Sequence, residues 1–209
     1  MSGVTVSASL LGRGPVAVVL GHGAGGNRHT PFLVRMAEAV AASGRGAVLY
    51  NFPYTEAGRR IPDAPELLEA TTRAVGEQAR LRRAQRVVHG GKSMGGRIAS
   101  QLVAHGAPAD ALVFLGYPLH PPGRPQTLRD RHLPRIAAPM LFLQGTRDAF
   151  ARWDLIEGVY QRLGEKATLH RLEGADHSFG VLKRSGRSAA EVERELIEAM
   201  LGWLGQRGL

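Results

Sequence analysis

Short, mostly apolar segments alternate along this chain with longer segments whose apolar residues recur at helical spacing. A strand that is apolar throughout has to be buried on both faces, and helices that connect parallel strands provide this cover. The expected strands are residues 16–20, 47–52, 86–89, 111–115, 140–143 and 168–172. The expected helices are residues 31–42, 63–83, 94–104, 155–163 and 189–204. The alternation therefore predicts an α/β fold with a mostly parallel sheet and helices on both faces.

The length of 209 residues predicts one domain, residues 1–209, with space for a substantial core. The absence of cysteine excludes disulfides, zinc–thiolate sites and thiol catalysis. The first apolar run, residues 16–20, is too short for a signal peptide, and no uncharged apolar stretch approaches the ~20 residues of a membrane span. We therefore expect a cytoplasmic protein without a membrane partner.

The chain carries a net charge of +9, from 27 basic and 18 acidic residues, and such a balance can indicate nucleic-acid binding. However, the arginines are scattered, with short pairs such as Arg59-Arg60 and Arg82-Arg83, and only 6% of the residues are aromatic. Nucleic-acid sites need clustered positive charge and stacking side chains. We expect no nucleic-acid partner, and the sequence does not indicate an oligomeric state.

The segment Gly91-Lys92-Ser93-Met94-Gly95 has the pattern Gly-x-Ser-x-Gly and lies where an expected strand meets an expected helix. A serine on such a sharp turn needs small neighbours, because the backbone is crowded there. The turn raises the serine hydroxyl above the edge of the sheet, which is how a nucleophile is presented to a substrate. Ser93 is therefore the predicted nucleophile.

The chemistry of a parallel sheet gathers at the carboxyl ends of its strands. Asp148 follows the expected strand 140–143, and His177 follows the expected strand 168–172. The chain order serine, aspartate, histidine is that of the α/β-hydrolases. We predict that His177 takes the proton of Ser93 and that Asp148 orients the imidazole and stabilises its protonated form.

Other residues near these positions have competing interpretations. Asp154 and Asp176 are alternatives to Asp148, which is preferred because a strand end positions it. His120 is the second choice as the base. Lys92 is expected to project away from the nucleophile and to form a structural ion pair.

An oxyanion formed during acyl transfer needs two N–H donors aimed at it. The amide of Met94, at the start of the helix, is one candidate, and the amide of Ala24, in a glycine-rich loop after the first strand, is the second. Several large side chains follow strand ends and are expected to line an apolar acyl pocket, although some of them can instead pack the loops. These predicted substrate-binding residues are Tyr54, Tyr117, Leu119, Phe150, Trp153 and Phe179.

Two nucleotide-binding motifs offer other interpretations of the glycines that the hydrolase prediction uses. Gly91-Lys92-Ser93 resembles the end of a P-loop, but Arg86 occupies the position where that motif needs glycine. Gly21-x-Gly23-x-x-Gly26 matches the dinucleotide fingerprint, but the first acidic residue after the next strand is Glu56, beyond the strand end where the fingerprint requires it. The sequence therefore favours an oxyanion loop over a nucleotide site.

Five segments together resemble the small lidless α/β-hydrolases related to dienelactone hydrolase. These are His22-Gly23-Ala24-Gly25-Gly26, Gly91-Lys92-Ser93-Met94-Gly95-Gly96-Arg97, Tyr117-Pro118-Leu119-His120-Pro121-Pro122-Gly123, Gly145-Thr146-Arg147-Asp148 and Ala175-Asp176-His177-Ser178-Phe179. The chain is most similar to the branch that includes the testis-expressed and non-specific-lethal-complex subunit 3 proteins. The resemblance implies the triad Ser93, Asp148 and His177 and a mostly parallel sheet of about seven to eight strands. Dienelactone hydrolase itself has a cysteine nucleophile where this chain has serine, so its specificity is not implied.

The connection at residues 117–134 is a short proline-rich loop where many relatives insert a lid, which predicts an open cleft. The sequence as a whole predicts a serine hydrolase that acts on small carboxylic esters or related acyl compounds through an acyl-enzyme. We expect no metal and no organic cofactor. The alternative is a catalytically silent interaction module with the same fold.

Overall fold

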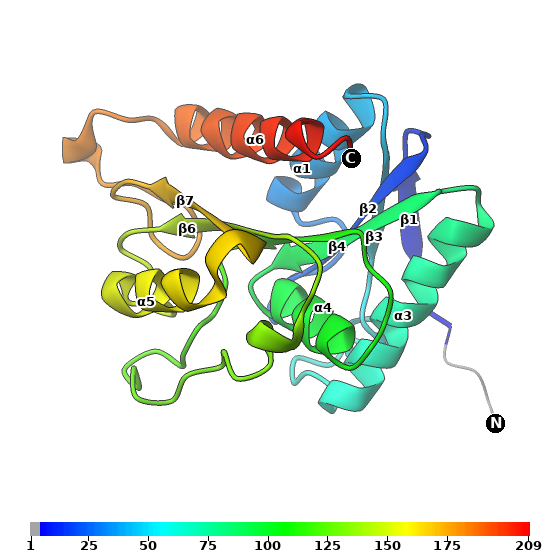
Figure 1. Ribbon diagram of the computed structural model, residues 1–209, viewed down its shortest axis with the longest axis horizontal. Helices are drawn as coiled ribbons and strands as arrows, with labels where there is room; N and C mark the ends of the chain where they lie inside the picture. The colour runs from blue at the N-terminus through cyan, green and yellow to red at the C-terminus, as the bar shows by residue number, and fades with distance from the viewer. Residues whose placement is uncertain (1–4) are drawn as a thin grey trace.

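The computed structural model describes residues 5–209, so the first four residues of the predicted domain lie outside the described residues (Figure 1). The described chain forms a seven-stranded sheet with the order β1-β3-β2-β4-β5-β6-β7. Its strands are β1 (Ala8–Leu11), β2 (Val16–Gly21), β3 (Gly46–Tyr50), β4 (Arg86–Lys92), β5 (Ala111–Leu115), β6 (Met140–Gly145) and β7 (Ala167–Leu172). All neighbouring strands pair in parallel except β1, which is antiparallel to β3. The predicted mostly parallel sheet is confirmed.

Helices cover both faces of the sheet, as predicted: α1 and α6 pack on one face, and α3, α4 and α5 on the other (Figure 1). The α-helices are α1 (Pro31–Ala42), α2 (Pro53–Glu56), α3 (Pro65–Leu81), α4 (Met94–Ala104), α5 (Trp153–Leu163) and α6 (Ala189–Gln206). Three single-turn 3₁₀ helices are η1 (Leu133–Arg135), η2 (Gly164–Lys166) and η3 (Lys183–Ser185).

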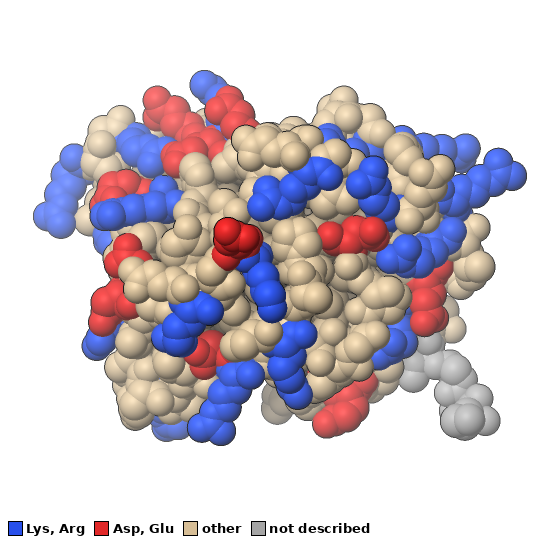
Figure 2. Space-filling model, viewed as in Figure 1, with Lys and Arg blue, Asp and Glu red and all other residues tan. Residues whose placement is uncertain are grey.

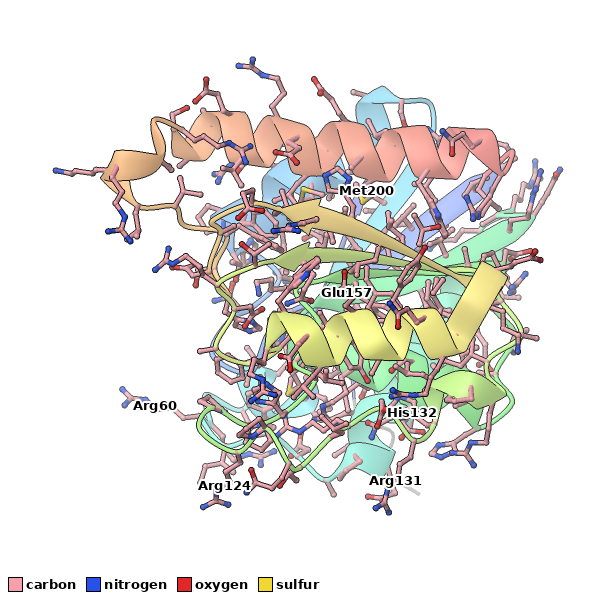
Figure 3. All side chains as sticks on the ribbon, turned by 60° about the vertical axis from the view of Figure 1, so that its left-hand side comes forward. Arg60, Arg124, Arg131, His132, Glu157 and Met200 are labelled. Atoms are coloured by element: carbon pink, nitrogen blue, oxygen red, sulfur yellow. The ribbon has the colours of Figure 1, made fainter. Side chains whose placement is uncertain are left out.

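The longer helices follow the periodicity of their apolar residues. In α1 the side chains of Leu33, Met36 and Val40 are buried at helical spacing, and Pro31 at the first turn is suited to a helix start because its fixed φ fits there. A capping box formed by Ser188 and Glu191 begins α6. Met200 on α6 points towards the sheet and is fully buried (Figure 3).

Among the strands and α-helices of the described chain, β1 and α2 were not predicted. The edge strand β1 alternates between exposed and partly buried residues, so it lacks the continuous apolar run by which the other strands were found. Helix α2 has one turn and begins at Pro53, immediately after the segment that was predicted as strand 47–52; the strand ends at Tyr50 instead. The connection from β5 to β6 contains only the short η1, which confirms that the fold has no lid.

Basic side chains are scattered among acidic ones on the face shown in Figure 2. Arg60, Arg124 and Arg131 project outward from loops (Figure 3). Other arginines form ion pairs at the surface, such as Arg162 with Asp130. Within residues 5–209, none of the helices combines the length and the apolar character that a membrane crossing requires.

A buried histidine on β4 predicts that stability falls in mild acid. His89 lies against α3, where a Cβ on Gly76 would come within 2.5 Å of its Cε1 atom. Burial lowers the pKa of His89 to about 4, and burial likewise lowers the pKa of His132 to about 4. Both values are below the value of about 6.5 that an unfolded chain has. The unfolded chain therefore binds more protons between these values, and the folded state loses stability as the pH falls from about 6.5 towards about 4.

His89 alone is expected to contribute a loss of about 1.4 kcal/mol in the free energy of unfolding per pH unit within this window, and His132 adds a loss in the same direction. Urea unfolding at about pH 7.5 and at about pH 5 measures it. The exposed His29 provides a control, since His29→Gln should leave the difference between the two pH values unchanged. Equal free energies of unfolding at both pH values would contradict the prediction.

Candidate active site

Ser93 lies in the turn between the end of β4 at Lys92 and the start of α4 at Met94. Its backbone has φ 51° and ψ −114°, a strained conformation for a residue with a side chain. The turn packs closely on the end of β2, because a Cβ on Gly95 would lie 2.2 Å from the carbonyl oxygen of Gly21. Glycine at position 95 therefore allows α4 to begin directly against β2 and fixes where Ser93 is presented.

Gly95→Ala is expected to destabilise the fold by about 1–3 kcal/mol, because the new methyl group meets backbone that cannot move aside. Gly202→Ala is the matched control, since Gly202 also lies in a helix but has no atom within 4 Å of an added Cβ. That variant is expected to be more stable by about 0.5–1 kcal/mol. Thermal or urea unfolding of the two variants measures both effects, and equal shifts would contradict the assigned packing.

The side chains of Ser93, Asp148 and His177 meet at the carboxyl ends of β4, β6 and β7. The Nε2 atom of His177 lies 2.8 Å from the Oγ of Ser93, and its Nδ1 lies 2.7 Å from the Oδ2 of Asp148. The side chain of Asp148 is fully buried, whereas that of His177 is 19% exposed. In this geometry, Nδ1–H of the neutral imidazole donates to the carboxylate and leaves Nε2 free to accept the proton of the serine hydroxyl.

Asp148 is held by two further donors that the sequence analysis did not identify as part of the site. Gln144 Nε2 donates to Asp148 Oδ2 at 2.6 Å, and the amide of Phe150 donates to Oδ1 at 2.7 Å. Gln144 is itself fixed, because its Oε1 accepts from the amide of Tyr117 at 2.8 Å. A glutamine at the end of the apolar run of β6 was the available signal, since a buried amide requires partners.

The two amides predicted for an oxyanion belong to the residue after Ser93 and to the loop after β2. Met94 is the first residue of α4, where backbone N–H groups have no partner within the helix. Ala24 lies in the exposed loop after β2, and within residues 5–209 its amide has no hydrogen-bond acceptor.

Buried polar contacts hold this loop in place. His22 Nδ1 lies 2.7 Å from the carbonyl oxygen of Gly23, and Nε2 accepts from the amide of Phe52 at 3.2 Å. Tyr54 donates its hydroxyl to the carbonyl oxygen of Ala24 at 2.8 Å. Burial lowers the pKa of His22, so the ring is neutral and its tautomer matches these two bonds. His22 is a second residue whose role the sequence analysis missed.

The six predicted substrate-binding side chains fall into two groups. Phe150 is partly exposed and its ring lies 4.2 Å from that of His177, centroid to centroid. Trp153 is partly exposed and packs against the guanidinium of Arg171 on β7. The other four present almost no surface to a substrate; they are Tyr54, Tyr117, Leu119 and Phe179. These four pack the loops, the second of the two interpretations that the sequence left open.

The structure also places the competing residues. Asp154 lies at the surface in a pair with Arg152. Asp176 accepts from the amides of Ser178 and Gly180, and thereby shapes its own loop.

Neither His120 nor Lys92 has the surroundings predicted for it. His120 is unsuitable as a base, because its Nε2 accepts from the amide of Arg152 and its Nδ1 lies 2.9 Å from the carbonyl oxygen of Pro121. The prediction of an ion pair for Lys92 is wrong: its Nζ donates to the carbonyl oxygen of His177 instead. Among residues 5–209, no three histidine, aspartate or glutamate side chains are grouped as metal ligands would be.

Several solved structures with a similar fold are described as hydrolases or lipases. XC6422 from Xanthomonas campestris, a serine hydrolase without a lid, is 20% identical with a TM-score of 0.73, over 95% of this chain and 89% of its own. Est1E from Butyrivibrio proteoclasticus, solved with ferulic acid, is 14% identical with a TM-score of 0.73, over 98% of this chain and 97% of its own. A monoacylglycerol lipase from Paleococcus ferrophilus is 14% identical with a TM-score of 0.73, over 97% of this chain and 99% of its own.

These likenesses establish the fold, and a family model shows the family. The model described as alpha/beta hydrolase domain matches residues 14–205, which is nearly the whole chain. This chain therefore belongs to the α/β-hydrolase domain family.

Proposed function

We propose that this protein is a serine hydrolase of small carboxylic esters or related acyl compounds. The observation that carries the proposal is the position of His177, within hydrogen-bond distance of both Ser93 and Asp148. A nucleophile, a base and a group that orients the base are the minimum set for acyl transfer through a covalent intermediate. The open approach to Ser93, without a lid, is consistent with a small substrate.

In the proposed reaction, Ser93 Oγ attacks the acyl carbonyl carbon while its proton passes to Nε2 of His177. The protonated imidazole then donates this proton to the departing alkoxide, and the acyl group remains on Ser93. A water molecule next attacks the acyl-enzyme, gives a proton to Nε2 and releases the acid, and the proton returns to Ser93. The carboxylate of Asp148 stabilises the imidazolium in both halves of the reaction.

The amides of Ala24 and Met94 are the proposed donors to the oxyanion of each tetrahedral intermediate. The Met94 amide also lies at the positive end of α4, which favours negative charge. Phe150 is the proposed contact for the apolar part of the substrate, since its ring lies beside His177 and is partly exposed.

The finer assignments rest on the sequence segments described above. We propose that the chain belongs with the testis-expressed and non-specific-lethal-complex subunit 3 branch, and that it functions as one cytoplasmic domain. We also propose that it has no nucleic-acid partner. Scattered rather than clustered basic side chains support this last assignment (Figure 2).

Labelling by a fluorophosphonate probe tests the proposed function whatever the natural substrate is. The probe forms a covalent bond to an activated serine, so we expect stoichiometric labelling at Ser93, located by peptide mass analysis. Turnover of short p-nitrophenyl esters should accompany it. A folded sample that neither labels nor hydrolyses these esters would instead support the silent interaction module.

A further inference from the structure

The side chain of Lys92 connects two parts of the proposed catalytic site. Lys92 is the last residue of β4 and directly precedes Ser93. Its Nζ donates to the carbonyl oxygen of His177 at 2.6 Å, and lies 5.1 Å from the centroid of the Phe179 ring. The amine therefore contacts the backbone of the base without touching the atoms that would react.

The backbone around this amine is shaped to accommodate it. Gly116, just after β5, has φ +71°, and a Cβ there would lie 3.0 Å from the Nζ of Lys92. Phe179 has φ 65°, which is uncommon for a residue other than glycine, and this conformation places its ring over the amine. Two residues with positive φ on different loops, Gly116 and Phe179, thus lie beside the ammonium group of Lys92.

The imidazole of His177 is bonded to Asp148 and Ser93, but the other backbone hydrogen bonds of its loop do not join the peptide group of the histidine to the sheet. Asp176 Oδ1 accepts from the amides of Ser178 and Gly180, so these bonds lie within the loop. The amide of Arg147 donates to the carbonyl oxygen of Ala175, two residues before the histidine. The bond from Lys92 is the one that joins the peptide group of His177 to the strand that leads to Ser93.

We propose that Lys92 is a positioning residue for His177, which holds the imidazole at the distance from Ser93 that proton transfer needs and adds a positive charge beside it. The inference rests on the proposed function. A methionine of similar length would fill the same space but would lose both the donor and the charge. An arginine would keep both, although its larger head has to fit beside Gly116.

Two carboxylates oppose the cost of burying this charge. Burial lowers the pKa of Lys92 to about 8, while Asp148 and Asp176 act in the opposite direction. Gly116, which lies beside the amine, and Gly23, which lies beside the Cγ of the same side chain, carry no charge. At neutral pH the amine is therefore protonated, and a positive charge disfavours the protonated form of an imidazole held close to it. Removing the charge should move the acid limb of the rate profile to higher pH.

The test compares Lys92→Met, Lys92→Arg and the control Lys166→Met, which removes a lysine at the opposite end of the sheet. Wild-type protein is first labelled with the fluorophosphonate probe and assayed with a short p-nitrophenyl ester. For Lys92→Met we expect kcat to fall roughly 10- to 100-fold, since small displacements of a catalytic group have effects of this size. KM should change by less than about twofold, because ground-state binding is not altered. Lys92→Arg should recover part of the loss, and Lys166→Met should behave as wild type.

The pH profile separates positioning from packing. The acid limb of kcat/KM should move to higher pH in Lys92→Met and not in Lys92→Arg. An unchanged kcat in Lys92→Met overturns the inference. The inference is also overturned if kcat falls in Lys92→Met but Lys92→Arg recovers none of the loss and the acid limb of kcat/KM does not move. If Lys92→Met does not fold, Lys92→Gln replaces it, and the position of the acid limb of its kcat/KM profile decides the outcome in the same way. A wild type that labels shows that the proposed function holds even if the inference fails, whereas a wild type that neither labels nor hydrolyses overturns both.

Discussion

Ser93→Ala is expected to abolish hydrolysis of short p-nitrophenyl esters and labelling by a fluorophosphonate probe. The variant removes the only oxygen that His177 Nε2 faces at hydrogen-bond distance within residues 5–209. Loss of the nucleophile from such a triad lowers kcat by roughly 10⁴- to 10⁶-fold. Steady-state kinetics and intact-protein mass measurement determine the loss of turnover and of labelling, respectively.

The backbone at Ser93 provides the control for folding. Alanine has to adopt the same φ of 51° and ψ of −114°, so Ser93→Ala should unfold at nearly the wild-type temperature. Glycine occupies this region without strain, so Ser93→Gly should be the more stable of the two by about 1–3 kcal/mol. Retained turnover in either folded variant would contradict the assignment of the nucleophile.

Asp148→Asn is expected to lower kcat/KM by roughly 10⁴-fold at neutral pH while the fold survives, because its new NH₂ group meets the two donors at the Oδ2 position, His177 Nδ1 and Gln144 Nε2. The Phe150 amide needs an acceptor at the Oδ1 position, so the new NH₂ group occupies the Oδ2 position and faces His177 Nδ1. The ring then has to accept at Nδ1 and carry its proton on Nε2, where it cannot take the proton of Ser93. Gln144 cannot relieve this conflict by rotating, since its Oε1 is held by the Tyr117 amide.

Asp154→Asn is the matched control for this prediction. Asp154 was one of the two competing aspartates in the sequence, but it lies at the surface in a pair with Arg152. Its replacement should leave kcat/KM within about twofold of wild type, since exposed ion pairs contribute little. Similar losses in the two variants would show that Asp148 acts only through general effects on charge or folding.

Most of the sheet was predictable because β2, β3 and β5 are apolar almost throughout and β6 begins with four apolar residues. Helix α1 was predicted with its observed bounds, since Pro31 and Ser43-Gly44 mark its ends. β1 and α2 were missed for opposite reasons: the strand is too exposed to show an apolar run, and the helix is too short to show a period. Chain order and the positions of the strand ends were sufficient to predict that the side chains of Asp148, His177 and Ser93 lie together.

What surrounds these three side chains was less accessible from sequence, because a strand end fixes where a residue lies but not where its side chain points. Tyr117 and Leu119 follow β5 as predicted, yet both point into the core. Gln144 and His22 each depend on a hydrogen bond from a backbone amide that is distant in the chain, Tyr117 and Phe52 respectively. Lys92 was expected to form an ion pair, but its partner is a carbonyl oxygen that no sequence pattern marks.

The order of the strands also distributes the three side chains unequally across the sheet. Ser93 follows β4, which is the central strand, whereas His177 follows β7, which is an edge strand with one neighbour. Edges fray more readily than centres, because fewer contacts have to break for them to open. The nucleophile therefore follows a strand that resists local opening, whereas the base follows one of the strands that open most readily. Local opening at β7 is enough to separate them while the remaining six strands stay folded, so heat inactivation can precede global unfolding.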